Sequence, residues 1–168
     1  MAVLWETDAG EKKEGVFIPR RDTGSLMNHL AGGCLFPGEH HRAAFSVRED
    51  GETIDFLMQS HDGVVSIRVS GRLGGTIPSS SCFSALEAAS RFFEPGSLGY
   101  SVTGEPGRLD GIELRTQGWC VEPLQIDEVH SSYFSDTTRF PPGSVEFDCA
   151  LMMRNLTHEW YSAQDLYV

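Results

Sequence analysis

The sequence predicts a mainly β fold, in which antiparallel strands carry one or two packed helices. Short segments that alternate apolar and polar side chains recur along the chain, and Asp-Gly or Gly-rich turns separate them, with 18 glycines in 168 residues. The length is that of one ordinary domain, and no repeat, low-complexity tract or linker divides it. We therefore treat residues 1–168 as a single domain.

The middle of the chain has the clearest strand pattern. Asp-Gly pairs, which favour the tight turns of hairpins, separate three alternating segments: 44–48, 53–59 and 65–69. In the first segment we expect Phe45 and Val47 to face the core. In the second, the apolar face consists of Ile54, Phe56 and Met58. These segments predict a three-stranded meander.

Further strands are predicted on both sides of this meander. They are 3–7, 16–19, 98–103, 111–116, 121–129 and 145–153. The polar residues 8–15, which include Lys12 and Lys13, are expected to form the loop of the first hairpin.

Two segments predict helices. The first runs from a cap at Asp22 or Thr23 to Leu30, and glycines at 32 and 33 end it. The second runs from about Ser81 to Phe93, where apolar side chains recur at helical intervals before a Pro-Gly stop at 95–96.

Charge and composition exclude several classes of partner. The 13 Lys and Arg residues against 24 Asp and Glu residues give a net charge of −11, which repels nucleic acid and anionic lipid. No segment has the length of a membrane helix, and the glycine-rich stretches lack the order of a phosphate-binding loop. We therefore expect no nucleic acid, membrane or nucleotide cofactor as a partner.

The cysteines point to a reducing compartment. They are widely spaced and form no Cys-x-x-Cys pair: Cys34, Cys82, Cys120 and Cys149. The polar start of the chain has no signal-peptide pattern. We expect a cytoplasmic protein with buried, free thiols.

Charged residues supply the candidate site. Arg20 and Arg21 lie where a strand leads into a helix, so either guanidinium could hold a carboxylate; alternatively, one pairs with an acidic neighbour and the other is solvated. Glu113 and Glu122 lie on strands expected to be adjacent, where a carboxylate pair would raise one pKa. His40 belongs to a Glu-His-His cluster whose neighbouring side chains point to opposite faces of a strand, so we expect no bound metal.

The chain also resembles a known group of barrels. Its sequence is similar to an uncharacterised prokaryotic protein family related to the acetoacetate decarboxylase-like barrels. The segments that carry the resemblance are Gly15–Thr23, Leu35–His41, Phe83–Phe93, Gly96–Tyr100, Trp119–Leu124, Ser131–Phe134 and Phe147–His158. The resemblance implies an antiparallel barrel, closed or partly open, with a helix packed on it and a central cavity.

The resemblance also limits the chemistry. Acetoacetate decarboxylases form a Schiff base on a lysine inside the barrel, whereas the two lysines of this chain, Lys12 and Lys13, precede the matching segments. Relatives of this kind are expected to have strands before the segment that matches Gly15. A barrel that lacks those strands has an open edge, which favours a homodimer.

Three functions follow as hypotheses, and the sequence does not choose among them. The first is a small-molecule-binding barrel without a cofactor, which holds a small carboxylate or carbonyl compound on Arg20 or Arg21 with Glu113 or Glu122. The second is a lyase or hydrolase-type enzyme acting on a keto acid by acid–base catalysis, with Glu113, Glu122 or His130 as the base. The third is a structural or interaction domain whose own aromatic side chains fill the cavity.

Overall fold

The computed structural model describes residues 2–7, 10–31, 38–94 and 98–167. These residues form twelve strands and two helices, which confirms the mainly β prediction. Contacts divide the chain into two compact units, one made of residues 1–41, 91–119 and 155–168 and the other of residues 42–90 and 120–154. No helix in the described part of the chain is long and apolar enough to cross a membrane.

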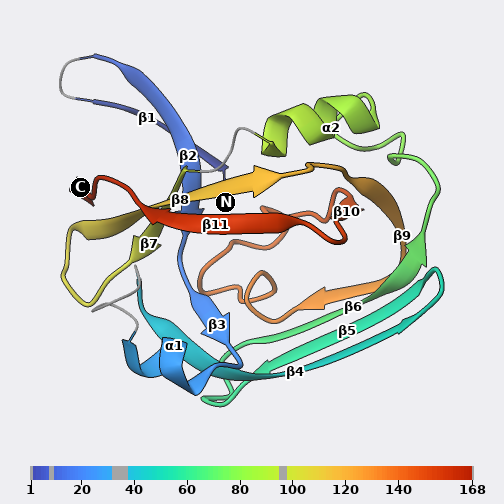
Figure 1. The fold of residues 1–168 in the computed structure, drawn as a ribbon, viewed down its shortest axis with the longest axis horizontal. Helices are drawn as coiled ribbons and strands as arrows, with labels where there is room; N and C mark the ends of the chain where they lie inside the picture. Colours follow the sequence, from blue (N-terminus) through green and yellow to red (C-terminus); the bar gives the residue numbers. More distant parts are fainter. Residues whose placement is uncertain (1, 8–9, 32–37, 95–97, 168) are drawn as a thin grey trace. The chain divides into compact units, whose positions relative to one another are not determined.

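The first unit is built on one sheet with the strand order β1-β2-β7-β8-β11, and β12 also pairs with β8 (Figure 1). The strands are β1 (Ala2–Glu6), β2 (Lys12–Ile18), β7 (Leu98–Val102), β8 (Arg108–Gln117), β11 (Thr157–Ser162) and β12 (Leu166–Tyr167). Tyr100 and Ile112 are buried in this sheet, and the Trp5 ring meets Tyr100 edge-on at 5.4 Å between ring centroids. These apolar side chains pack together and stabilise the sheet of the first unit.

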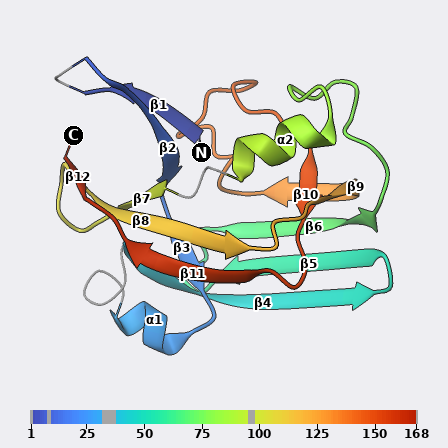
Figure 2. The ribbon, with the colours of Figure 1, turned by 45° about the horizontal axis from the view of Figure 1, so that its top comes forward.

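Two features of this sheet were absent from the sequence interpretation. The strands β2 and β7 pair in parallel, while the hairpins β1–β2 and β7–β8 are antiparallel. The strand β11 pairs along β8 over six residues (Figure 2). Both pairings join distant parts of the sequence, and local alternation does not reveal such partners.

The lysine positions differ from the prediction. Lys12 and Lys13 lie at the start of β2 rather than in the turn, because the hairpin pairs Glu6 with Lys12. Both side chains are exposed.

The second unit contains the predicted meander. Its strands lie in the order β10-β9-β6-β5-β4, and each of these pairs is antiparallel. They are β4 (His40–Asp50), β5 (Thr53–Ser60), β6 (Ser66–Leu73), β9 (Glu122–Ser131) and β10 (Ala150–Met152). The core consists of Ala43, Met58 and Val65, with Phe56, Ile67 and Tyr133 packed against it. Burial of Ile54 and Met58 confirms the predicted face of β5.

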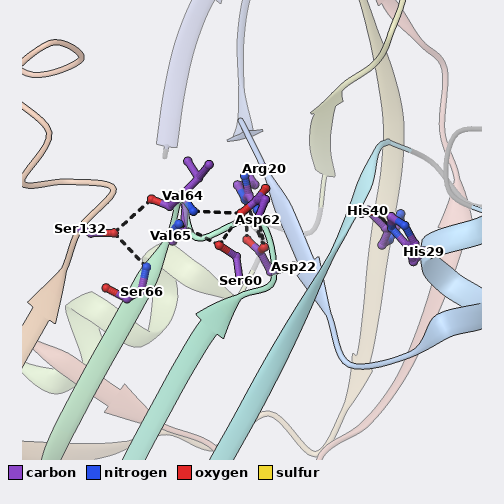
Figure 3. A network of polar contacts seen from close by, with 10 residues as sticks. All are labelled: Arg20, Asp22, His29, His40, Ser60, Asp62, Val64, Val65, Ser66 and Ser132. Atoms are coloured by element: carbon purple, nitrogen blue, oxygen red, sulfur yellow. Dashed lines mark hydrogen bonds and ion pairs between the residues drawn. The ribbon is translucent and has the colours of Figure 1, made fainter.

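A polar network fixes the β5–β6 turn (Figure 3). The Ser60 hydroxyl donates to Asp62 at 2.6 Å and accepts the Val65 N–H at 2.8 Å. The Ser66 N–H donates to the Ser132 hydroxyl at 2.9 Å, which ties this turn to the end of β9. Gly63 has a φ of 71°, as the predicted Asp-Gly turn requires.

Three predictions for the second unit need correction. Phe45 and Val47 are exposed rather than buried, because only the start of β4, at Ala43, packs into the core of this unit. The predicted strand 145–153 is reduced to β10. Cys82 and Cys120 are exposed and Cys149 is partly buried, so the prediction of buried thiols is wrong for these three; Cys34 lies outside the described residues.

Both helices are shorter than predicted. The helix α1 (Leu26–Ala31) is capped by Ser25, whose hydroxyl accepts the Asn28 N–H, because Arg20 binds the Asp22 carboxylate instead. The helix α2 (Leu86–Phe93) follows a turn-rich segment, 79–85, that was predicted as its first turns. The glycine and proline stops predicted at 32–33 and 95–96 lie outside the described residues.

Between the strand β2 and the helix α1, the short strand β3 (Arg21–Thr23) carries the first residues of the candidate site.

Candidate functional site

The two adjacent arginines have different environments. Arg20 donates two hydrogen bonds to the Asp22 carboxylate, from Nε to Oδ2 and from Nη2 to Oδ1, both at 2.9 Å (Figure 3). Their side chains are only 12% and 10% exposed, so this is a largely desolvated ion pair. The predicted alternative of an arginine paired with an acidic neighbour is therefore confirmed for Arg20.

Arg21 is partly buried and bonded within the protein, so it is not the freely solvated arginine of the other half of that alternative. Its Nε donates to the Ser101 hydroxyl at 2.7 Å, and Ser101 is 1% exposed. The guanidinium carbon lies 5.8 Å from the centre of the Trp160 ring. Its Nη2 is buried and has no hydrogen-bond partner among the residues that the structure describes. A charged group therefore presents an unused donor inside the first unit.

Asp110 provides the nearest opposite charge. It is 8% exposed, its Oδ2 accepts the Gly38 N–H at 2.8 Å, and its Oδ1 lies 3.1 Å from Nη2 of Arg108. Desolvation lowers the pKa of Arg21, while the Asp110 charge opposes that effect. Asp110 thus balances part of the Arg21 charge while its own oxygens are bound to other groups.

His40 lies close enough to respond to the charge on Arg21. Burial lowers its pKa most, a hydrogen bond to the Gly38 carbonyl raises it, and the charge on Arg21 lowers it again. Its backbone carbonyl accepts a hydrogen bond from Nδ1 of His29 (Figure 3). The balance favours a neutral His40 imidazole at neutral pH.

Gly38 lets the backbone approach Ser101 closely at this site. Its φ is +77°, and a Cβ at this position would lie 2.5 Å from Cβ of Ser101. Glycine is therefore required both for the backbone conformation and for the close approach. We call Arg21, Gly38, His40, Ser101 and Asp110 the Arg21 site; all five belong to the first unit.

The two predicted glutamates do not join it. Glu113 lies on β8 and pairs with Arg115 at 2.9 Å, and this contact lowers the pKa of Glu113. Glu122 lies on β9 in the other sheet and is exposed, as is His130. The predicted adjacency of their two strands is therefore wrong, because β8 and β9 lie in different sheets.

Sequence reasoning missed Ser101 and Asp110. Asp110 precedes a glycine, and such a pair usually marks a turn, yet both residues lie inside β8. The available signal was a charged residue between Leu109 and Ile112, where strand alternation is interrupted. Ser101 gives no comparable signal, because a serine in a strand is common on either face.

A cleft of about 210 Å³ lies in the second unit, between β9, β10 and the chain at 76–78. Its lining is mainly apolar and includes Leu124, Ile126 and Phe147, with Cys149 beside them. None of the predicted site residues lines it. Over the parts of the chain that the structure describes, no three His, Cys, Asp or Glu residues form a group able to hold a metal ion.

Comparison with known proteins gave no match: no protein-family model, no curated protein and no solved structure matches the chain.

Proposed function

We propose that the protein binds a small carboxylate-containing ligand, with Arg21 as the anchor. One observation carries this proposal: Nη2 of Arg21 is buried, and no described part of the chain offers it a hydrogen-bond partner. A buried donor left unsatisfied costs about 1–3 kcal/mol, and more when it is charged. A ligand that accepts this hydrogen bond recovers that free energy.

The neighbours of Arg21 favour a carboxylate over a phosphate. Ser101 already occupies Nε, so one edge of the guanidinium is used within the protein. The Asp110 carboxylate nearby adds one negative charge that a second anion must tolerate. A singly charged ligand meets less repulsion than a phosphate dianion, especially in a chain with a net charge of −11.

The ligand class that we propose is a small keto acid or simple carboxylic acid. The resemblance to the acetoacetate decarboxylase-like barrels supports this class and is itself part of the proposal. Schiff-base chemistry is not part of it, because Lys12 and Lys13 are the only lysines of the chain and both are exposed on β2. The function is thus binding through a guanidinium, without a covalent bond to an amine.

Acid–base catalysis by the predicted residues has less support. Glu113 is engaged with Arg115, and Glu122 and His130 are exposed. Glu113 is not among the five residues of the Arg21 site, and Glu122 and His130 belong to the second unit, so we do not propose them as bases for a ligand bound there.

Calorimetric titration with formate, acetate, pyruvate and acetoacetate tests the proposal, with ionic strength held constant by chloride. We expect at least one acid to bind, and Arg21→Gln to weaken that binding at least tenfold. Arg115→Gln is the matched control, since Arg115 is an exposed arginine on β8 that pairs with Glu113. Absence of binding to all four acids, or equal loss in both variants, would refute Arg21 as the anchor.

A further inference from the structure

A second cluster of reactive side chains surrounds Asp148 in the second unit. The Ser81 hydroxyl donates to Oδ2 of Asp148 at 2.7 Å, and the Cys82 N–H donates to Oδ1 at 3.0 Å. The Cys82 thiol donates to the same Oδ2 at 3.4 Å. Cys149 follows Asp148 directly in the chain. We call these four residues the Asp148 cluster.

Two cysteines therefore lie beside one carboxylate. Cys82 is bonded to Asp148 through both its backbone N–H and its thiol, and Cys149 is the next residue after Asp148 in the chain. Cys82 lies in the turn-rich segment before α2, and Cys149 directly precedes β10. Neither cysteine is held in a helix or a strand, so neither is fixed by a ladder of backbone hydrogen bonds.

From this geometry we propose that Cys82 and Cys149 form a reversible disulfide, and that this pair is a redox modification site. The oxidant is a small hydroperoxide or a low-molecular-weight disulfide. The more exposed Cys82 meets the oxidant first, and Cys149, which is partly buried, completes the bond.

Hydrogen peroxide oxidises the two thiols to a disulfide in two steps. The Cys82 thiolate attacks one peroxide oxygen, the O–O bond breaks, and water leaves after protonation, so that Cys82 becomes a sulfenic acid. The Cys149 sulfur then attacks the Cys82 sulfur, the S–O bond breaks, and a second water leaves. Two thiols are oxidised by two electrons and one peroxide is reduced to two waters.

The disulfide has a structural consequence for the cleft. Cys149 is one of the cleft residues, and the chain at 76–78 contributes another wall only a few residues before Cys82. A covalent bond between Cys82 and Cys149 ties these two walls together. Oxidation is therefore expected to restrict the cleft and to raise the melting temperature of the second unit.

The test uses the full chain, fully reduced, then freed of reductant and treated with hydrogen peroxide or, in a separate arm, with oxidised glutathione. We expect the mass to fall by the two thiol hydrogens, and peptide mapping to show a Cys82–Cys149 link that a reductant removes. Cys82→Ser and Cys149→Ser should each abolish the link. Cys120→Ser is the matched control, because Cys120 is an exposed cysteine outside the cluster, and it should leave the link unchanged.

Other products overturn the proposal. These are sulfinic acid or a glutathione adduct on Cys82 with Cys149 still reduced, or a disulfide that uses Cys34 or Cys120 instead. Circular dichroism of each serine variant checks that the fold is retained, and the wild-type peptide map decides the question independently of the variants.

Discussion

The Arg21 site and the Asp148 cluster each gather polar side chains around a charged group, but they differ in how many hydrogen bonds that group makes. In the Asp148 cluster the carboxylate accepts hydrogen bonds from a hydroxyl, a backbone N–H and a thiol. In the Arg21 site the guanidinium keeps a buried nitrogen that has no hydrogen-bond partner among the described residues. A charged group whose hydrogen bonds are all made within the protein holds the surrounding chain in place. A charged group that keeps an unused donor can bind a ligand.

The largest loss of stability is expected when a buried ion pair is broken. Arg20→Gln removes one partner of the desolvated Arg20–Asp22 pair and leaves the carboxylate without its guanidinium. We expect the free energy of unfolding to fall by about 3 kcal/mol. Urea unfolding measures this loss, and Arg21→Gln should cost clearly less. An equal loss of unfolding free energy in both variants would contradict the view that Arg20 stabilises the fold through its ion pair while Arg21 is available to a ligand.

The next effect concerns the glycine that shapes the Arg21 site. In Gly38→Ala the residue has a positive φ and the new Cβ would lie 2.5 Å from Cβ of Ser101. In Gly51→Ala the φ is also positive, at +59°, but no atom lies within 4 Å of the new Cβ. Strain alone costs about 1–2 kcal/mol in either variant. Gly38→Ala should therefore destabilise the protein more than Gly51→Ala and also weaken ligand binding. Equal unfolding free energies would show that the close approach at Gly38 is relaxed in solution.

These contrasts also show which parts of the molecule were predictable from sequence. The hairpins β4–β5 and β5–β6 follow from local alternation and Asp-Gly turns, and the Arg20–Asp22 pair joins residues that are two apart. The Arg21 contact to Ser101 spans 80 residues and the Gly38 contact to Asp110 spans 72. Such contacts depend on which strands become neighbours, and the parallel β2–β7 pair that brings Ser101 into place has no local signal.

A smaller effect is expected on thiol reactivity. Partial desolvation raises the pKa of the Cys82 thiol, and the hydrogen bond to Asp148 raises it further. Asp148→Asn removes the negative charge, so the thiol pKa should fall and the thiolate fraction at a fixed pH between neutrality and the wild-type pKa should rise. Cys82 alkylation by iodoacetamide is expected to accelerate severalfold at pH 7.5, with Cys120 as the internal reference. An unchanged or slower rate would mean that Asp148 does not hold the thiol protonated.

The same carboxylate predicts a modest pH dependence of stability. Hydrogen bonds, first that from Ser81, lower the pKa of Asp148 in the folded protein. Its contribution to stability is therefore complete above the unfolded pKa of about 3.9. It is lost as the pH falls through the lower, folded pKa. Acid unfolding should consequently begin at a higher pH in Ser81→Ala than in wild type; identical acid midpoints would show that this hydrogen bond does not contribute.

The titration of His40 reports whether Arg21 receives the carboxylate of a ligand. The charge on Arg21 helps to lower the pKa of His40, so a carboxylate bound to Arg21 must offset that charge and raise the His40 pKa. The measurement is an NMR pH titration of the His40 ring protons without and with a saturating carboxylic acid. We predict an upward shift of the His40 pKa. A His40 pKa that is unchanged at saturation would contradict the claim.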